Sequence, residues 1–157
     1  MPGLLEYASY VFFFSAAGLG VFFEFSDYKK FIERSHEYKN VPSPILPSLC
    51  WLVQGFLWMA IFLVGSSYFY LPESWSDAYA TWPFWYRVFF FHVSMTFKRF
   101  FYYGPFSITT GAIIASGFGY NGKGKENKEK WDKVIQIYVF EIELGKSPNE
   151  MLRFWNH

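Results

Sequence analysis

Histidine and asparagine are the residue types through which this chain could take part in acid–base or amide-assisted chemistry. His92 lies between Phe91 and Val93 inside a long apolar segment. An ionisable side chain in such a segment is a functional candidate by default. A structural imidazole bonded to a neighbouring helix fits the same sequence equally well. His36 lies among charged residues and is expected to face water.

Asn156 is the second candidate, and a predicted helix determines where it lies. Residues 147–150 read SPNE, which has the residue types of a capping box with proline at the first helical position, so a helix is predicted over residues 148–157. Asn156 would then lie one turn beyond Leu152. Its amide could be held in a site, or it could end the helix facing water. No spacing among the histidines suggests a metal site, and the single Cys50 excludes a cysteine-based one.

Residues 117–122 read GFGYNG, which has the spacing of a dinucleotide-binding glycine motif. That motif requires a strand before it, a helix after it and an acidic residue about 20 positions further on. Here an apolar segment precedes it and a lysine-rich stretch follows. We therefore predict a tight turn, in which Asn121 and Gly122 supply positive φ angles.

The elements that must position these residues are dominated by one uncharged run, Asn40–Pro72. A run of about 20 apolar residues crosses the hydrocarbon of a bilayer, and its central part carries no polar face. Aromatic residues make up 25% of the chain and charged residues 17%, which agrees with a membrane protein. A net charge of +1 without a basic tract gives no support for nucleic acid binding.

The predicted fold class is an all-α membrane protein with about three to four transmembrane or re-entrant helices plus short interfacial amphipathic helices. The break near residue 104 rests on Gly104-Pro105, which should kink or interrupt a helix. The predicted parts are spans near residues 7–23, 45–70 and 84–103, a broken or re-entrant segment over 104–120, an interfacial helix over 26–38, a polar loop over 121–147 and the capped helix over 148–157.

The distribution of lysine and arginine favours re-entry of the 104–120 segment. The basic stretch Lys29–Lys39 and the cation-free stretch Leu71–Trp82 flank the long apolar span, which places the basic stretch in the cytosol. If the 104–120 segment crossed fully, the lysine-rich stretch Lys123–Lys133 would be lumenal, against the rule. Non-helical backbone at membrane depth is tolerated where it lines a cavity, so we predict re-entry without crossing.

A set of short motifs, in this order, resembles the membrane-bound O-acyltransferase family, and within it the lysophospholipid acyltransferases. The motifs are WPFWYR at residues 82–87, ASGFGYNG at 115–122, KWD at 130–132 and FWN at 154–156. The opening PGLLEYA also resembles that family. No single piece is specific, but the combination extends over nearly the whole chain.

The resemblance implies transfer of an acyl group from acyl-CoA, the co-substrate, to a lysophospholipid hydroxyl, with no other cofactor. Asn156 matches the family's conserved asparagine, while Trp131 and Asp132 match positions expected to be structural. Asn121, Trp155 and His92 are further candidates for the reaction chamber or its support. The family's catalytic histidine follows the asparagine motif, and neither His92 nor the terminal histidine matches it, so the chain alone is expected to be inactive.

Three classes of function therefore remain open from the sequence. The chain is a segment of an acyltransferase, a catalytically inactive structural subunit of a larger membrane complex, or a fragment of a transporter or channel. Expected partners are membrane lipids, acyl-CoA and lysophospholipid in a complete enzyme, and other membrane subunits in the second case. The family implies the endoplasmic reticulum, and the subunit alternative allows a mitochondrial membrane. Both ends resemble cuts through a longer protein.

Overall fold

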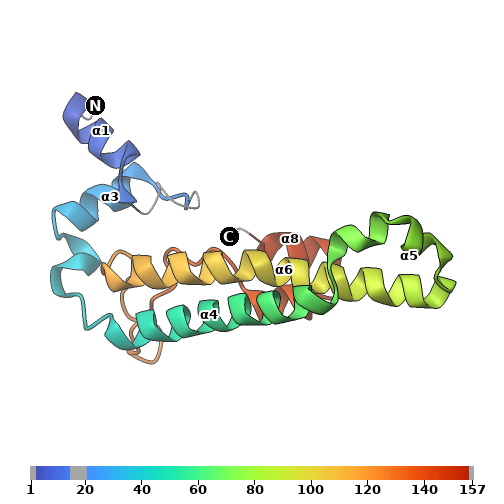
Figure 1. Ribbon diagram of the computed structural model, residues 1–157. Coiled ribbons are helices and arrows are strands. Elements are labelled where there is room, and N and C mark those ends of the chain that lie inside the picture. The colour runs from blue at the N-terminus through green and yellow to red at the C-terminus, as the bar shows by residue number, and fades with distance from the viewer. Residues whose placement is uncertain (1–2, 15–20, 156–157) are drawn as a thin grey trace.

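A computed structural model describes residues 3–14 and 21–155 of the chain. The described part is built of helices and connecting loops, with two isolated β-bridges and no extended strand. Figure 1 shows two long helices side by side, with the first short helices at one end of the pair. In chain order the elements are α1 (Leu4–Val11), α3 (Phe25–Ile32), η1 (His36–Asn40), α4 (Ile45–Tyr68), η2 (Leu71–Trp75), α5 (Asp77–Thr81), α6 (Phe84–Ala115), α7 (Val139–Glu143) and α8 (Pro148–Phe154).

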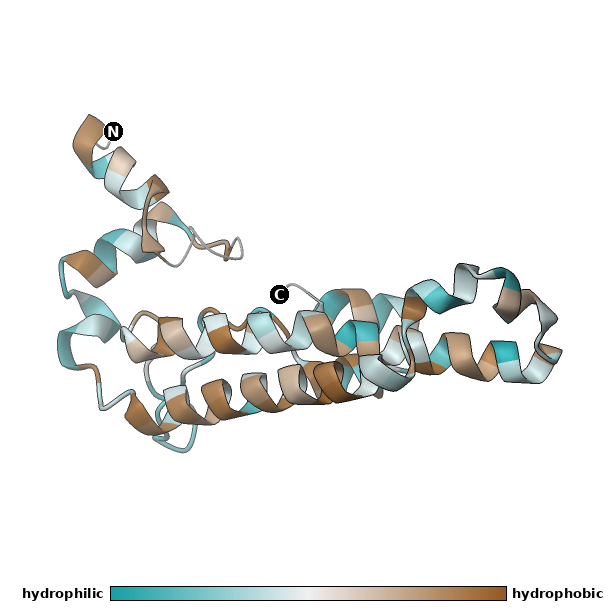
Figure 2. Ribbon diagram, in the orientation of Figure 1, coloured by the Kyte–Doolittle hydropathy of each residue, from teal (hydrophilic) through white to brown (hydrophobic). Residues whose placement is uncertain are grey.

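Helix α4 has the length and apolar surface of a membrane-crossing helix. Its 24 residues extend about 36 Å at 1.5 Å per residue, which exceeds the roughly 30 Å of bilayer hydrocarbon. Among the described residues, Ile45–Trp75 is the one helical stretch whose length and composition would allow it to cross a membrane. Figure 2 shows predominantly apolar residues along α4. Large apolar side chains on it are exposed, including Leu49, Val53, Phe56, Leu57, Leu63 and Val64.

Helices α4 and α6 pack antiparallel and very closely, because glycines lie at their contacts. A Cβ atom added to Gly55 would lie 2.6 Å from Ile108 Cγ1 and 2.9 Å from the carbonyl oxygen of Gly104. Near the start of α4, the Ser48 hydroxyl donates to the Gly111 carbonyl over 2.9 Å. Small residues that let two backbones approach in this way are typical of helix pairs in membranes.

Helix α6 is continuous through Pro105, so the predicted break at Gly104-Pro105 is wrong. The separate segments predicted over residues 84–103 and 104–120 form one helix, Phe84–Ala115, with the proline inside it. Proline removes one backbone donor, but packing against a neighbouring helix offsets this cost in membrane proteins. Gly104 is buried against the Met59 side chain of α4, which supplies that packing.

The N-terminal part is more broken than predicted. The predicted span over residues 7–23 lies partly outside the described residues, and within the described part α1 ends at Val11. The predicted interfacial helix over residues 26–38 also ends early, at Ile32. Arg34 and His36 have φ angles of 49° and 53°, a left-handed conformation that does not continue a helix, and η1 follows.

The region around α3 and η1 is fastened to the chain that follows α6. Phe118 is fully buried, and its carbonyl accepts a 2.9 Å hydrogen bond from the Tyr38 hydroxyl. The rings of Tyr38 and Phe118 stack with centroids 6.2 Å apart, while Phe13, Phe23 and Phe31 each meet Phe118 edge-on. This aromatic cluster holds the two segments together across about 80 residues of sequence.

An ion cluster centred on Lys133 reinforces the same junction. Its ammonium lies 2.5 Å from Glu37 Oε1, 3.2 Å from Asp27 Oδ1 and 4.9 Å from the centre of the Tyr38 ring. Partial burial alone would raise the pKa of both carboxyl groups, but hydrogen bonds from Lys133 and, at Asp27, from Lys30 lower each pKa below its ordinary value. Burial alone would lower the pKa of the Lys133 ammonium, but its hydrogen bonds to the carboxylates of Glu37 and Asp27 raise that pKa above its ordinary value. Burial raises the pKa of Tyr38 to about 12.

The close contact between α4 and α6 predicts a sharp response to added volume at Gly55. We expect Gly55→Leu to destabilise the protein by about 1–3 kcal/mol, because its side chain collides with the α6 backbone at Gly104. Thermal unfolding in detergent measures the loss. The control is Gly3→Leu, where an added Cβ meets nothing within 4 Å. Equal melting temperatures for the two variants would contradict the glycine contact.

The Lys133 cluster predicts acid sensitivity. Asp27 and Glu37 have lowered pKa values in the folded state, so their stabilisation is present above their ordinary pKa values of 3.8 and 4.5 and is lost as the pH falls further. We expect the melting temperature to drop between about pH 5 and pH 3, and Lys133→Gln to reduce that drop. The exposed Lys125→Gln serves as the control and should retain the full drop.

Candidate functional site

A polar stripe runs along one face of α6. His92, Thr96, Arg99 and Tyr103 occupy positions i, i+4, i+7 and i+11, which coincide on one side of a helix. The Thr96 hydroxyl donates to the His92 carbonyl over 3.0 Å and accepts from Arg99 Nη2 over 3.2 Å. These contacts lock the guanidinium against its own helix, so that its remaining donors point toward the C-terminal segment of the chain.

Glu143 of α7 binds the last two residues of this stripe, Arg99 and Tyr103. Arg99 donates from Nε to Glu143 Oε1 and from Nη2 to Oε2, both over 2.9 Å, and the Tyr103 hydroxyl donates to Oε1 over 2.6 Å. The paired geometry between a guanidinium and a carboxylate gives strength and direction together. We call Arg99, Tyr103 and Glu143 the α6–α7 clamp, since they fasten α7 to α6 across 40 or more residues of sequence.

The clamp holds the ionised carboxylate of Glu143 in place. Partial burial would raise the pKa of Glu143, but the hydrogen bonds from Arg99 and Tyr103 lower it below its ordinary value. The carboxylate therefore stays ionised at neutral pH, with both oxygens accepting hydrogen bonds. Arg99 and Tyr103 thus hold the Glu143 carboxylate in a fixed position.

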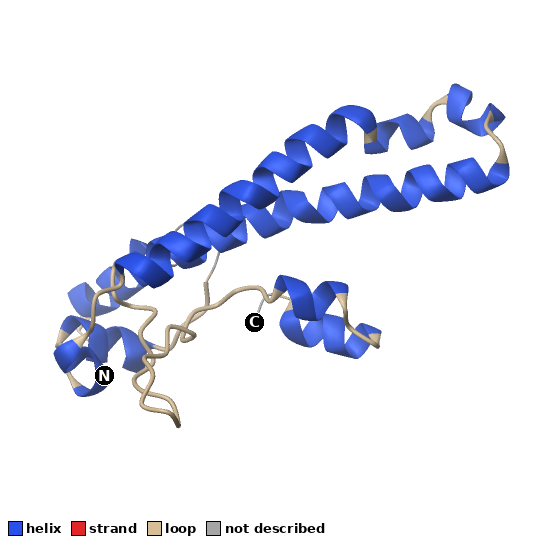
Figure 3. Cartoon of the chain, turned by 90° about the horizontal axis from the view of Figure 1, so that it is seen from below, coloured by secondary structure: helices blue, strands red, loops and turns tan. Residues whose placement is uncertain are grey.

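Trp155 is packed beside the clamp, at the end of the predicted capped helix. The cap is confirmed, because the Ser147 hydroxyl accepts from the Glu150 backbone N–H over 3.2 Å and α8 begins at Pro148. The Trp155 ring lies 6.0 Å from that of Tyr103, centre to centre. The backbone of residue 155 also pairs with Ile137. Figure 3 shows α7 and α8 together beside the long helix pair.

A groove of about 220 Å³ runs between α6 and the α7–α8 pair. Its lining is almost entirely apolar. Lys98 and Arg99 are among the lining residues, but the Arg99 guanidinium is bound to Glu143. Such a lining suits an apolar group. The remaining lining residues are Met95, Tyr102, Ile142, Met151, Leu152 and Trp155.

The predicted site residues Asn121, Trp131 and Asp132 lie together, but at the far end of α6. The Asn121 side-chain amide donates to Asp132 Oδ1 over 2.8 Å, and Trp131 packs on Tyr120 with ring centres 5.2 Å apart. These contacts hold together the loop that follows α6.

The glycine motif forms the predicted turn with one difference. Gly117 and Gly122 have φ angles of 91° and 72°, whereas Asn121 is not among the described residues with a positive φ angle. A loop follows the motif, so the strand and helix of a dinucleotide site are not present around it in the described part of the chain. Gly117 follows the C-cap of α6 and has the left-handed conformation that commonly ends a helix.

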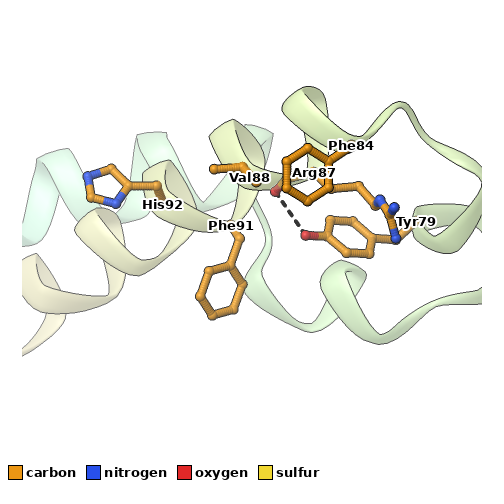
Figure 4. Close-up of a pocket in the computed structure, with 6 residues that line it drawn as sticks. All are labelled: Tyr79, Phe84, Arg87, Val88, Phe91 and His92. Carbon is orange, nitrogen blue, oxygen red and sulfur yellow. Dashed lines mark hydrogen bonds between the residues drawn. The ribbon is translucent and has the colours of Figure 1, made fainter.

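His92 lies on the same face of α6 as the clamp, seven residues or about two helical turns before Arg99. It is exposed, and it is 11 residues before Tyr103, or about 16 Å along the helix. Figure 4 shows its ring pointing away from Tyr79, whose hydroxyl donates to the Arg87 carbonyl over 2.8 Å. A hollow of about 350 Å³ links these three residues. The structure therefore places His92 far from Asn121, Trp131 and Asp132, which follow the other end of α6.

Asn156 falls outside the described residues, so its predicted role stays a prediction. Within residues 3–14 and 21–155, no group of three or more histidine, cysteine or acidic side chains could hold a metal ion. The sequence reasoning missed Thr96, Arg99, Tyr103 and Glu143. The i, i+4, i+7, i+11 spacing on α6 could have indicated three of them, but nothing local identifies Glu143 as their partner.

Comparison with known proteins gives the chain a family. The family model described as "MBOAT, membrane-bound O-acyltransferase family" matches residues 1–157. The chain is 31% identical over 166 residues to a lysophospholipid acyltransferase of Schizosaccharomyces pombe, and the match covers 99% of this chain and 32% of that protein. A lysophospholipid acyltransferase of Saccharomyces cerevisiae is 30% identical, with 99% and 28% covered. Lysophospholipid acyltransferase 2 of Arabidopsis thaliana is 30% identical, with 99% and 35% covered.

The chain spans about a third of the length of the curated relatives it matches. The resemblance expected from the motifs at residues 82–87, 115–122, 130–132 and 154–156 is confirmed, as is an all-α architecture. Since the family model matches from the first residue to the last, the chain belongs to the membrane-bound O-acyltransferase family.

Proposed function

We propose that this chain forms part of a lysophospholipid acyltransferase, which moves an acyl group from acyl-CoA to the free hydroxyl of a lysophospholipid. The observation that carries the proposal is the match of the whole chain to relatives named lysophospholipid acyltransferase. The apolar groove beside Trp155 supports it, because both substrates carry an apolar chain. By family we assign the protein to the endoplasmic reticulum membrane.

The proposed reaction defines what the protein must supply. The lysophospholipid hydroxyl oxygen attacks the thioester carbonyl, the C–S bond breaks, and the hydroxyl proton leaves with the CoA thiol. Negative charge develops on the carbonyl oxygen, where a fixed amide N–H is an effective donor. We assign this role to the side chain of Asn156, which matches the family's asparagine. A base must also accept the hydroxyl proton, and His92 is not assigned to it.

The α6–α7 clamp has a positioning role in this proposal. Trp155 directly precedes Asn156, and it is packed against Tyr102, Tyr103 and Phe106 of α6. The clamp holds α7 on the same part of α6, and α8 packs on α7. Small errors in the position of a catalytic group cost large factors in rate, so a fixed support for this segment is expected in an acyltransferase.

Substitution of Asn156 tests the proposed reaction. We expect Asn156→Ala to lower the rate of acyl transfer by about 10²-fold or more, because the developing oxyanion loses a donor. The assay measures radiolabelled acyl-CoA incorporation into a lysophospholipid, with membranes that contain the protein in its natural full length. The control is Asn149→Ala, an exposed asparagine of α8. Equal rates for both variants would exclude the assigned role, and no transfer by the unmodified protein would favour an inactive structural subunit.

Substitution of Glu143 tests the positioning role of the clamp. We expect Glu143→Gln to lower kcat by roughly tenfold or more, since the neutral amide cannot accept both hydrogen bonds from Arg99. The KM for acyl-CoA should change less than kcat, and cleavage by a protease near Gly145 should become faster. The matched control is the exposed Glu141→Gln on the same helix. A kcat loss without faster cleavage would indicate direct participation of Glu143 in chemistry.

A further inference from the structure

A cleft of about 680 Å³ lies where the turn between α3 and η1 meets the start of α4 and the end of α6. Its lining combines the apolar side chains of Phe31, Tyr38 and Val41 with the cationic side chains of Arg34 and Lys39. The remaining lining residues are Ile32, Asn40, Pro42, Pro44, Ser116 and Gly117. The cleft thus places two positive charges next to an apolar surface.

The positive charges of the cleft have no acidic partner in the described part of the chain, because the nearby carboxylates are engaged elsewhere. Lys133 binds both Asp27 and Glu37, and Lys29 binds Glu33 over 3.7 Å. No ion pair within 4.0 Å involves Arg34 or Lys39 among residues 3–14 and 21–155. The lowered pKa values of Asp27 and Glu37 agree with carboxylates already bound to cations.

The backbone places Arg34 at the cleft through an unfavourable conformation. Arg34 and His36 both have left-handed φ angles, of 49° and 53°, which residues with a Cβ atom rarely adopt. The Ser35 N–H donates to the Lys30 carbonyl over 2.9 Å, which closes the end of α3 around this turn. Such strain persists where the surrounding structure fixes it, and it is concentrated at functional sites.

The cleft lies at the boundary where the chain enters the apolar helix α4. Pro44 lines the cleft, and the next two residues, Ile45 and Leu46, are 73% and 72% exposed. Apolar side chains that face outward at the first turn of a membrane-crossing helix mark the edge of the hydrocarbon. The phosphate groups of a bilayer lie just outside that edge, so a cleft lined by Pro44, directly before α4, is within their reach when α4 crosses the membrane.

We propose that this cleft binds the phosphate group of an anionic phospholipid, with Arg34 and Lys39 as the ligands. A guanidinium matches the geometry of phosphate oxygens, an ammonium adds a second charge, and the apolar lining contacts the glycerol and the first part of an acyl chain. The site lies at the C-terminal end of α6, whereas Trp155 packs near its middle. The proposal does not depend on the acyl transfer described above, and its test measures binding alone.

Native mass spectrometry of the full-length protein, titrated with phosphatidylglycerol in detergent, tests the site. We expect the double variant Arg34→Gln, Lys39→Gln to weaken binding by tenfold or more. The control Lys125→Gln, Lys146→Gln removes the same charge from two exposed lysines away from the cleft, and should bind as the unmodified protein does. The exchange variant Arg34→Lys, Lys39→Arg keeps both charges and should retain most of the binding.

Three results would overturn the proposal. The first is unchanged affinity in the glutamine double variant, with melting temperatures that show all proteins to be folded. The second is an equal loss in the Lys125 and Lys146 control, which would indicate attraction by net charge alone. The third is displacement of phosphatidylglycerol by millimolar inorganic phosphate or glycerol 3-phosphate, which would assign the cleft to a soluble phosphate. Failure of displacement, together with the selective loss, supports a lipid ligand.

Discussion

The close antiparallel contact of α4 and α6 is the constraint on which the rest of the structure depends. Gly55 and Gly104 let the two backbones approach to a separation that no side chain would fit, and the Ser48 hydroxyl bonds to the Gly111 carbonyl nearby. Because lipid gives little hydrophobic drive for two apolar helices to associate, tight packing and such hydrogen bonds must hold the pair. Helix α6 can then serve as a rigid support for segments that have little structure of their own.

Two segments far apart in the sequence use that support at different places. The α6–α7 clamp holds the C-terminal segment near the middle of α6, through Glu143. The aromatic cluster and Lys133 hold the N-terminal segment near the end of α6, through Tyr38 and Phe118. In both cases an ionised carboxylate is bound by a cation and partly shielded from water, which makes the contact directional. Helix α6 therefore fixes both the candidate site and the cleft.

The sequence predicted those features whose cause is local. The apolar run ending at residue 70 corresponds to α4, Ile45–Tyr68, because a charge-free stretch of that length has few alternatives in lipid. The start of α8 followed from Ser147 and Pro148, whose effects act within one turn. The break predicted at Pro105 was wrong, because the local tendency of proline to interrupt a helix is outweighed by the packing of α6 on α4. Glu143 was missed because its partners are 40 or more residues away.

The separation of His92 from Trp155 bears on how the candidate site could be complete. A base and an oxyanion donor must both reach one thioester, within a few ångströms of the reacting atoms. His92 lies about 16 Å along α6 from Tyr103, on which Trp155 packs, and helix α6 is continuous between them. No rotation of a side chain closes such a distance. Under the proposed function, a base that works next to Trp155 therefore comes from an element other than the His92 turn of α6, as the order of motifs in the family also implies.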